Sequence, residues 1–309
     1  MRLIYKDKKS DGGIELYRHS DKKALTLVTC RRPDFKKYYL EYQNDIFERK
    51  VVVHNDSNLE ELKNAITSNT MLVSIMHVNN EIGTIQKIEE IGNIIKTKNK
   101  DTLFHVDGVQ SFGKYDINVN RAKIDLFSMS GHKIHAMKGT GALYIRKGTK
   151  IKNVFFGGNQ ENGMRPGTEN VPGIVSFSTA AKEMQTNHNE ILERLKNIKF
   201  KMFDLLTKNI DEIYLNGPSL EDGAYHILNV HIKRIKAPIL INALSEEGIY
   251  VSAGSACSAK NKTASNTLVS IGLNKEDIES SIRISFSRFT REEDIEYVVN
   301  KIKENVDKI

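Results

Sequence analysis

Residues 124–145 read IDLFSMSGHKIHAMKGTGALYI. They belong to a series of predicted strands and helices that decides the fold. The apolar run Ile124–Met129 predicts a buried strand, and Ala142–Ile145 predicts another. Toward the N-terminus the pattern continues as a strand, an amphipathic helix and a further strand, which are Met71–Met76, Ile88–Lys98 and Thr102–Val106. Strands that alternate with helices indicate an α/β fold with a mainly parallel sheet.

The C-terminal part of the chain has a different, α+β character. A helical stretch from Ile174 to Asn209 carries apolar residues at three- and four-residue spacing, which predicts one buried face formed by Leu192, Leu195, Ile198, Met202 and Leu205. Beyond it the sequence predicts two strands and two helices, at Ile227–Ile232, Ser281–Ser285, Ala237–Glu247 and Glu292–Val306. We therefore expect a large α/β domain over residues 1–180, with a divergent segment 1–50, and a small domain over residues 181–309.

Composition excludes several classes of protein. The net charge of +7 comes from scattered lysines among interleaved acids, and aromatic residues make up only 7%, so we expect no nucleic-acid surface. No apolar run approaches the ~18 residues of a membrane span. The first residues lack the apolar core of a signal peptide, and two cysteines are too few for a disulfide framework. These features favour the reducing cytoplasm.

Lys133 is the first candidate catalytic residue, because it is the last residue of Ser130-Gly-His-Lys133, just after a predicted strand. An amine beside hydroxyl, glycine and imidazole groups suits a Schiff base with an aldehyde cofactor such as pyridoxal phosphate, whose anionic tail the neighbours would hold. The alternative is an ordinary surface lysine. Asn80, Asp107 and Lys133 all follow predicted strands, and parallel sheets bind ligands at that edge.

Asp107 and Gln110 lie together in the stretch His105-Val-Asp-Gly-Val-Gln110. A carboxylate facing a pyridine nitrogen keeps that nitrogen protonated, which makes the ring an electron sink. Gln110 could then donate a hydrogen bond to the ring oxygen. The alternative for Asp107 is a helix cap.

Two further groups follow from the C-terminal part. Cys257 lies in Ser252-Ala-Gly-Ser-Ala-Cys-Ser-Ala-Lys260, where small neighbours and lysines predict an accessible, nucleophilic thiolate rather than a buried thiol. Cys30, after an apolar run, is interpreted as structural. Arg283 alternates with Ile282 and Ile284, so it is a candidate for binding a substrate carboxylate or, alternatively, a salt-bridged surface group.

Six motifs, in this order, resemble the cysteine desulfurases of the NifS/IscS type in the class V aminotransferase family. They are HVNNEIGT at 77–84, HVDGVQS at 105–111, SGHK at 130–133, GGNQENGMRPGT at 157–168, GSAC at 254–257 and SIRISFSRFT at 281–290. The resemblance runs from about residue 56 to the C-terminus. It implies the aspartate aminotransferase-like fold, a homodimer, pyridoxal 5'-phosphate as cofactor and L-cysteine as substrate.

The resemblance also implies the role of each site residue. Lys133 would carry the cofactor as a Schiff base, and the residues that hold the cofactor would be Asp107 at the pyridine nitrogen, Gln110 at the ring oxygen, and Ser130, His132 and the second subunit's Thr168 at the phosphate. Asn80 and Arg283 would bind the carboxylate of L-cysteine. Cys257 would take the substrate sulfur as a persulfide and leave L-alanine.

That persulfide would serve a sulfur acceptor or an iron–sulfur scaffold protein. We expect no resident metal site, and the one metal role considered is a transient iron–sulfur ligand at Cys257.

One part of the family pattern has no match in this sequence. The family carries a Gly-Ala-Thr-Glu loop that binds phosphate at a helix N-terminus, and a histidine in a Thr-x-x-x-Glu-His context. The nearest stretch here is Val28–Phe35, which has no histidine, so we expect the usual N-terminal segment to be missing. The alternative function is therefore a catalytically impaired or inactive truncated homologue that acts as a binding or structural remnant.

Overall fold

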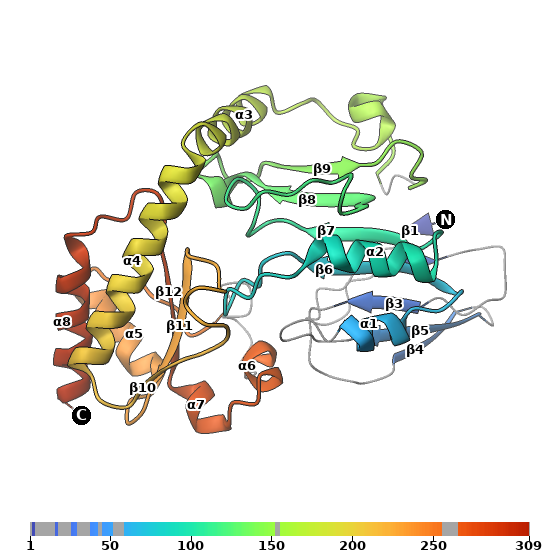
Figure 1. Ribbon diagram of the computed structural model, residues 1–309. Coiled ribbons are helices and arrows are strands. Elements are labelled where there is room, and N and C mark those ends of the chain that lie inside the picture. The colour runs from blue at the N-terminus through green and yellow to red at the C-terminus, as the bar shows by residue number, and fades with distance from the viewer. Residues whose placement is uncertain are drawn as a thin grey trace.

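The computed structural model describes residues 59–151, 155–254 and 265–308 in full. Ahead of residue 59 it gives the backbone of five strands, which are β1 (Arg2–Leu3), β2 (Leu16–Tyr17), β3 (Thr26–Thr29), β4 (Tyr38–Tyr42) and β5 (Asp45–Val51). Figure 1 shows a large sheet at one side of the molecule and a smaller sheet, covered by long helices, at the other.

The large sheet has seven strands in the order β4-β5-β3-β6-β7-β8-β9. Its later strands are β6 (Thr70–Met76), β7 (Leu103–Asp107), β8 (Leu126–Ser130) and β9 (Gly141–Ile145). Pairing is parallel from β5 through β3, β6 and β7 to β8, and antiparallel for β4 with β5 and for β8 with β9. The mainly parallel α/β sheet is thereby confirmed. The sequence alone indicated neither the reversed direction of β9 nor the strand at Tyr38–Tyr42.

Two helices pack against this sheet, α1 (Leu59–Ala65) and α2 (Ile88–Lys98). The bounds of α2 are those that the amphipathic pattern predicts, and its buried face includes Ile88, Ile91 and Ile95. A Cβ atom on Gly92 would lie 1.9 Å from the backbone oxygen of Ala122, so only glycine allows this close approach of the helix.

The long helical stretch predicted after residue 174 is two helices. They are α3 (Val171–Thr186) and α4 (His188–Asn209), and the break at Asn187 corrects the single-helix expectation. The buried face of α4 also differs from the predicted one. Leu192 and Leu205 are half-buried, whereas their neighbours Ile191 and Leu206 are buried. Because neighbouring apolar residues both fit a helical period, the spacing alone did not choose between them.

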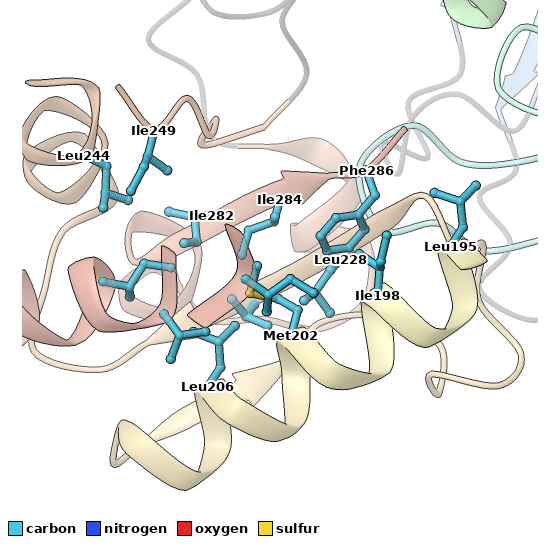
Figure 2. Packing of buried hydrophobic residues seen from close by; sticks show 14 of the residues in the cluster. Leu195, Ile198, Met202, Leu206, Leu228, Leu244, Ile249, Ile282, Ile284 and Phe286 are labelled. Carbon is cyan, nitrogen blue, oxygen red and sulfur yellow. The ribbon is translucent and has the colours of Figure 1, made fainter. Parts of the chain in front are cut away.

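The smaller sheet is antiparallel and consists of β10 (Ile213–Leu215), β11 (Ile227–Ile232) and β12 (Ser281–Ser285). Helices α4, α5 (Ala237–Glu246) and α8 (Asp294–Asp307) enclose its core, which Figure 2 shows in close view. Two short helices, α6 (Asn266–Ser270) and α7 (Lys275–Glu279), complete this part. The domain division near residue 180 stays a prediction. None of the described helices is long and apolar enough to cross a membrane.

The loop that follows β6 joins the two parts of the molecule. The amide of Ala224 donates to the carbonyl of Gly83 at 2.8 Å, and Thr84 forms a β-bridge with Gly223. Gly83 has φ +76°, a conformation that favours glycine. This loop therefore carries its residues to the contact between the large sheet and the small one.

Candidate active site

Asp107 and Lys133 lie at the same edge of the large sheet. Asp107 ends β7, opposite Ser128 of β8, and Lys133 lies in the turn that directly follows β8. The amide of Gly108 donates to the carbonyl of Ser128 at 2.9 Å, which holds the two strand ends together. The expected meeting of these two groups at the carboxyl ends of parallel strands is thus what the structure has.

Asp107 is half-buried and accepts a hydrogen bond at Oδ1 from the amide of Val109, at 3.0 Å. Residues 109–114 form turns rather than a helix, so Asp107 precedes no described helix that it could cap. Gln110 lies half-buried in these turns. A Cβ on Gly108 would come within 2.1 Å of the Phe127 ring, so glycine lets the turn approach β8 closely.

A row of polar side chains crosses the sheet beside Asp107, and the sequence did not indicate it. His105 lies on the same face of β7 as Asp107, since alternate residues of a strand share a face. Its Nδ1 atom is 2.7 Å from the hydroxyl of Ser74, and its Nε2 atom is 3.2 Å from the hydroxyl of Ser128. The register of β6, β7 and β8 therefore fixes the imidazole ring of His105 on the face of the sheet that carries Asp107.

Lys133 lies in a short 3₁₀ turn, Gly131–Ile134, and is half-buried. A Cβ on Gly131 would lie 2.3 Å from Oγ1 of Thr140, so the start of this turn requires glycine. His135 ends the turn in the left-handed region, at φ 71° and ψ 20°. A non-glycine residue in that conformation costs about 1–3 kcal/mol, so the surrounding contacts must hold it. Lys133 is thus a fixed, half-buried residue rather than an ordinary surface lysine.

Ser130 and His132 supply hydrogen-bonding groups next to Lys133. The hydroxyl of Ser130 lies 2.8 Å from Nδ1 of His132. Partial burial lowers the pKa of His132, and the charges of Lys133 and Lys138 lower it further. The positive charges of Lys133 and Lys138 also attract an anion. This donor set therefore fits a phosphate group, and Asp107 fits a protonated pyridine nitrogen.

Arg283 and Asn80 are brought together although they are far apart in the chain. Arg283 is half-buried in β12, and its Nη1 atom donates to the backbone carbonyl of Asn80 at 2.7 Å. Its backbone amide also donates to the carbonyl of Ser252 at 2.6 Å. Arg283 is thus held, half-buried, at the junction of the two parts.

The two remaining predicted site residues, Thr168 and Cys257, are not brought to the turn of Lys133 by the described residues. Thr168 is exposed in the segment between the 3₁₀ turn Gln160–Gly163 and α3, and no described contact links it to the turn of Lys133. Cys257 lies outside the described residues, as do most of the residues of Val28–Phe35 and Cys30. Among the residues that the structure describes, no group of three or more His, Cys, Asp or Glu side chains could hold a metal ion.

Glu81 joins the two parts of the molecule, and the sequence did not single it out. Its carboxylate accepts hydrogen bonds from the hydroxyls of Ser265, at 2.5 Å, and Thr267, at 3.2 Å. Its backbone carbonyl accepts from Nδ2 of Asn229 at 3.0 Å. A Cβ on Gly254 would lie 3.7 Å from the same carboxylate. Glu81 therefore links the loop after β6 to residues on both sides of positions 255–264.

We expect Glu81→Ala to weaken the contact between the two parts of the molecule. Hydrogen bonds to a charged group contribute about 1.5–3 kcal/mol, so the variant should lose up to that much stability. Urea unfolding measures the loss, and hydrogen exchange should rise in α6, which Ser265 caps. The control is Glu89→Ala, which removes an exposed ion pair with Arg121 and should cost about 0–1 kcal/mol. Equal stability of the two variants would contradict the prediction.

The arrangement is that of a pyridoxal-phosphate-dependent enzyme: a half-buried lysine after one parallel strand, a carboxylate at the end of the next, and a phosphate-binding donor set beside them. The chain belongs to the class V aminotransferase family, whose sequence profile matches residues 41–298. That family uses pyridoxal 5'-phosphate.

The relatives by sequence are cysteine desulfurases. The chain is 40% identical over 292 residues to cysteine desulfurase IscS of Buchnera aphidicola subsp. Baizongia pistaciae, covering 94% of this chain and 69% of the relative. It is 43% identical over 243 residues to IscS of Clostridium botulinum strain Hall, covering 78% of this chain and 61% of the relative. IscS of Escherichia coli O139:H28 is 38% identical over 312 residues, covering 96% of this chain and 73% of the relative.

Solved structures of NifS-like proteins also resemble the chain. A NifS-like protein superposes with a TM-score of 0.80 at 32% identity, covering 94% of this chain and 77% of that one. The NifS-like protein of Rickettsia africae ESF-5 superposes with a TM-score of 0.76 at 27% identity, covering 93% and 77%. The aspartate aminotransferase-like fold expected from the motifs is thus confirmed, and the chain is a cysteine desulfurase homologue.

Proposed function

We propose that this chain removes sulfur from L-cysteine, giving L-alanine and a persulfide on Cys257. The observation that carries the proposal is the placement of Asp107 and Lys133 at one sheet edge, in a chain about 40% identical to cysteine desulfurases. The matched part of the chain spans 61% of the length of the Clostridium relative.

The roles of the residues around the cofactor follow from their chemistry. Pyridoxal 5'-phosphate supplies an electron sink and an aldehyde that an amine can join. Lys133 would hold it covalently and Asp107 would keep the pyridine nitrogen charged. Its other contacts would come from Gln110 at the ring oxygen and from Ser130, His132 and the second subunit's Thr168 at the phosphate.

The substrate would be held by Asn80 from the loop after β6 and Arg283 from β12, and attacked by Cys257. Arg283 and Asn80, already in contact, would bind the carboxylate of L-cysteine. The Cys257 thiolate would attack the substrate sulfur, so that a sulfur–sulfur bond forms while the carbon–sulfur bond breaks. The sulfur leaves as a persulfide on Cys257, and the carbon takes up a proton to give L-alanine. A thiolate nucleophile supports a reducing compartment, and we place the protein in the cytoplasm.

A homodimer is supported by large apolar side chains that are exposed on the segments before and after Thr168. They lie after the turn of Lys133, on β9, before the second 3₁₀ turn and on α3, and they are Met137, Leu143, Phe155, Phe156, Val171, Ile174 and Val175. Large apolar surfaces of this kind mark protein contacts. A second copy seated there would cover them, and analytical ultracentrifugation of the full chain tests the dimer. The further partner that we propose is a sulfur acceptor or iron–sulfur scaffold protein.

The decisive experiment uses the full chain with pyridoxal 5'-phosphate and L-cysteine. We expect a borohydride-reducible adduct on Lys133, with equal formation of alanine and releasable sulfur. Cys257→Ser should keep the adduct and lose sulfur transfer. An unchanged sulfide yield in that variant would remove Cys257 from the reaction, and absence of any adduct would favour the inactive remnant. No described residue specifically favours that alternative.

A further inference from the structure

The small sheet carries a buried network of polar side chains on one of its two faces. Successive residues of β11 alternate between the faces, and Leu228 lies with Ile282 and Ile284 of β12 in the apolar core that Figure 2 shows. Asn229 and His231 therefore lie on the opposite face, where both are buried, Asn229 with only 1% of its surface exposed. Buried polar groups are costly unless they are hydrogen-bonded, so their partners indicate what this face does.

Asn229 holds the backbone of the loop that follows β6. Its Nδ2 atom donates to the backbone carbonyl of Glu81 at 3.0 Å. Its cross-strand neighbour, Arg283, donates to the preceding carbonyl, that of Asn80, at 2.7 Å. Two consecutive carbonyls of the loop are thus held by one pair of residues from β11 and β12. These bonds set where the backbone of Asn80 lies relative to the small sheet.

The loop has a shape of its own, which its internal hydrogen bonds maintain. The side-chain oxygen of Asn79 accepts from the amides of Glu81 and Ile82, at 2.8 and 3.0 Å. The amide of Gly83 donates to the carbonyl of Asn79 at 3.1 Å. All of these bonds lie within the turn, so they do not orient it against the rest of the molecule. That orientation depends on contacts from outside, among them the bond from Asn229.

A chain of further hydrogen bonds reaches the amide group of Asn229. Its Oδ1 atom accepts from Nδ2 of Asn216 at 2.8 Å, and the same Nδ2 atom donates to the hydroxyl of Ser281 at 3.0 Å. The Oδ1 atom of Asn216 lies 2.7 Å from Nδ1 of His231. The hydroxyl of Ser281 donates in turn to the backbone carbonyl of Asp277 at 2.6 Å. Four buried side chains thus form one connected network.

Both ends of this network require the same direction of hydrogen bonding. A backbone carbonyl only accepts, so the amide nitrogen of Asn229 must face Glu81 and its oxygen must face Asn216. The hydroxyl of Ser281 gives its proton to a backbone carbonyl, so it accepts from Asn216. The oxygen of Asn216 is then left for His231, whose Nδ1 atom must carry a proton. A reversed amide at either asparagine would bring two buried acceptors face to face, which is unfavourable.

We propose that Asn229 is a positioning residue: the network holds its amide in one orientation, and the amide holds the loop that carries Asn80 to the substrate carboxylate. This inference rests on the function proposed above for Asn80, but two of its three measurements need neither cofactor nor substrate. Asn229 itself would make no contact with the reacting atoms.

The first measurement locates the proton of His231 in the wild-type chain, by 15N NMR of the imidazole ring. The signal is assigned by its loss in His231→Gln. Burial lowers the pKa of His231, so the ring is neutral at neutral pH and carries one proton. We expect this proton on Nδ1. An unprotonated Nδ1 atom would overturn the proposal even if the variants of Asn229 failed to fold, because the network could not then run in the required direction.

The second measurement is hydrogen exchange over residues 79–83 in the full chain without cofactor. Asn229→Leu has a side chain of similar size without a donor, so exchange should rise about five- to tenfold. Asn229→Asp keeps an acceptor for Asn216 and, when ionised, loses only the donor, so it should also raise exchange. The matched control is Asn99→Leu, because Nδ2 of Asn99 likewise donates to a backbone carbonyl, that of Thr67, at 3.1 Å. This control should leave exchange over residues 79–83 unchanged.

The third measurement is steady-state turnover of L-cysteine by the cofactor-loaded chain. Asn80 would bind the carboxylate and not the carbon–sulfur bond that breaks. Asn229→Leu should therefore raise KM about five- to tenfold and keep kcat within about twofold, whereas Asn99→Leu should keep both. A merely structural role of Asn229 would lower the amount of folded enzyme, and with it the apparent kcat, without moving KM.

The outcomes separate this proposal from the proposed function. Unchanged exchange over residues 79–83 in folded Asn229→Leu would overturn the positioning role, and so would a lower kcat at an unchanged KM. If exchange rises as expected but the wild-type chain consumes no L-cysteine, the desulfurase function fails, while the role of Asn229 in holding the loop stands.

Discussion

Replacing Lys133 by alanine should abolish both the covalent attachment of the cofactor and the release of sulfur from L-cysteine. Lys133 lies in the turn after β8, and no other lysine of the described residues lies in the 3₁₀ turn that follows this strand. In the function proposed above, its amine would be needed twice, to hold the cofactor and to move a proton during the reaction. A positioned acid–base group alone contributes ~10²–10⁴-fold, so the residual rate should be at least ~10²-fold lower.

The experiment follows the cofactor's absorbance, borohydride reduction and mass spectrometry of the modified peptide. Lys133→Arg should behave like Lys133→Ala, because a guanidinium stays protonated and does not join an aldehyde. Lys100→Ala, which removes an exposed lysine before the start of β7, at the other end of that strand from Asp107, should retain the adduct and the rate. A reducible adduct on a different lysine in Lys133→Ala would mean that this site is not the one that binds the cofactor.

The regular elements could be predicted from the sequence because their signals are local. The pattern of Ile88–Lys98 gave α2 with its bounds, and Asp107 and Lys133 could be expected at one edge once the strands before them were identified. The break at Asn187 was not predicted, because no glycine or proline marks it and apolar spacing continues on both sides. The direction of β9 depends on its partner and not on its own residues.

The contacts that complete the site could not be predicted, because they join distant parts of the chain. Glu81 meets Ser265 only after the small sheet has docked on the loop that follows β6. Lys114 looks in the sequence like any other lysine in a charged chain, and only the fold shows that it is buried against Lys133. The one signal of its burial in the sequence was that Lys114 follows Phe112 and a glycine.

The position of Arg283 depends on the packing of the small sheet. Arg283 pairs with Asn229 across β11 and β12, and the neighbouring pair, Leu228 with Ile284, belongs to the buried core. The same two strands therefore present polar side chains to the loop after β6 and apolar ones to the helices, as alternation along a strand requires. The stability of this core and the geometry of the residues proposed to bind the substrate carboxylate are consequently linked.

Leu228→Ala should therefore be strongly destabilising and should also impair substrate binding. Leu228 is fully buried, and Figure 2 shows it among the side chains of α4 and β12, near Ile198 and Phe286. Removing a buried leucine costs about 2–5 kcal/mol, because the cavity left behind closes only in part. That is a large share of the ~5–15 kcal/mol that stabilises a typical protein.

Urea unfolding with cofactor bound measures the stability, and the KM for L-cysteine reports the position of Arg283. Ile239→Ala is the matched control, because Ile239 lies on α5 of the same part but is 54% exposed, so it should change neither quantity appreciably. A Leu228→Ala variant as stable as this control would show that the apolar side of β11 does not hold the small sheet together. A destabilised variant with an unchanged KM would instead show that substrate binding does not depend on the core. The pairing of Asn229 with Arg283 would then persist without the Leu228 side chain.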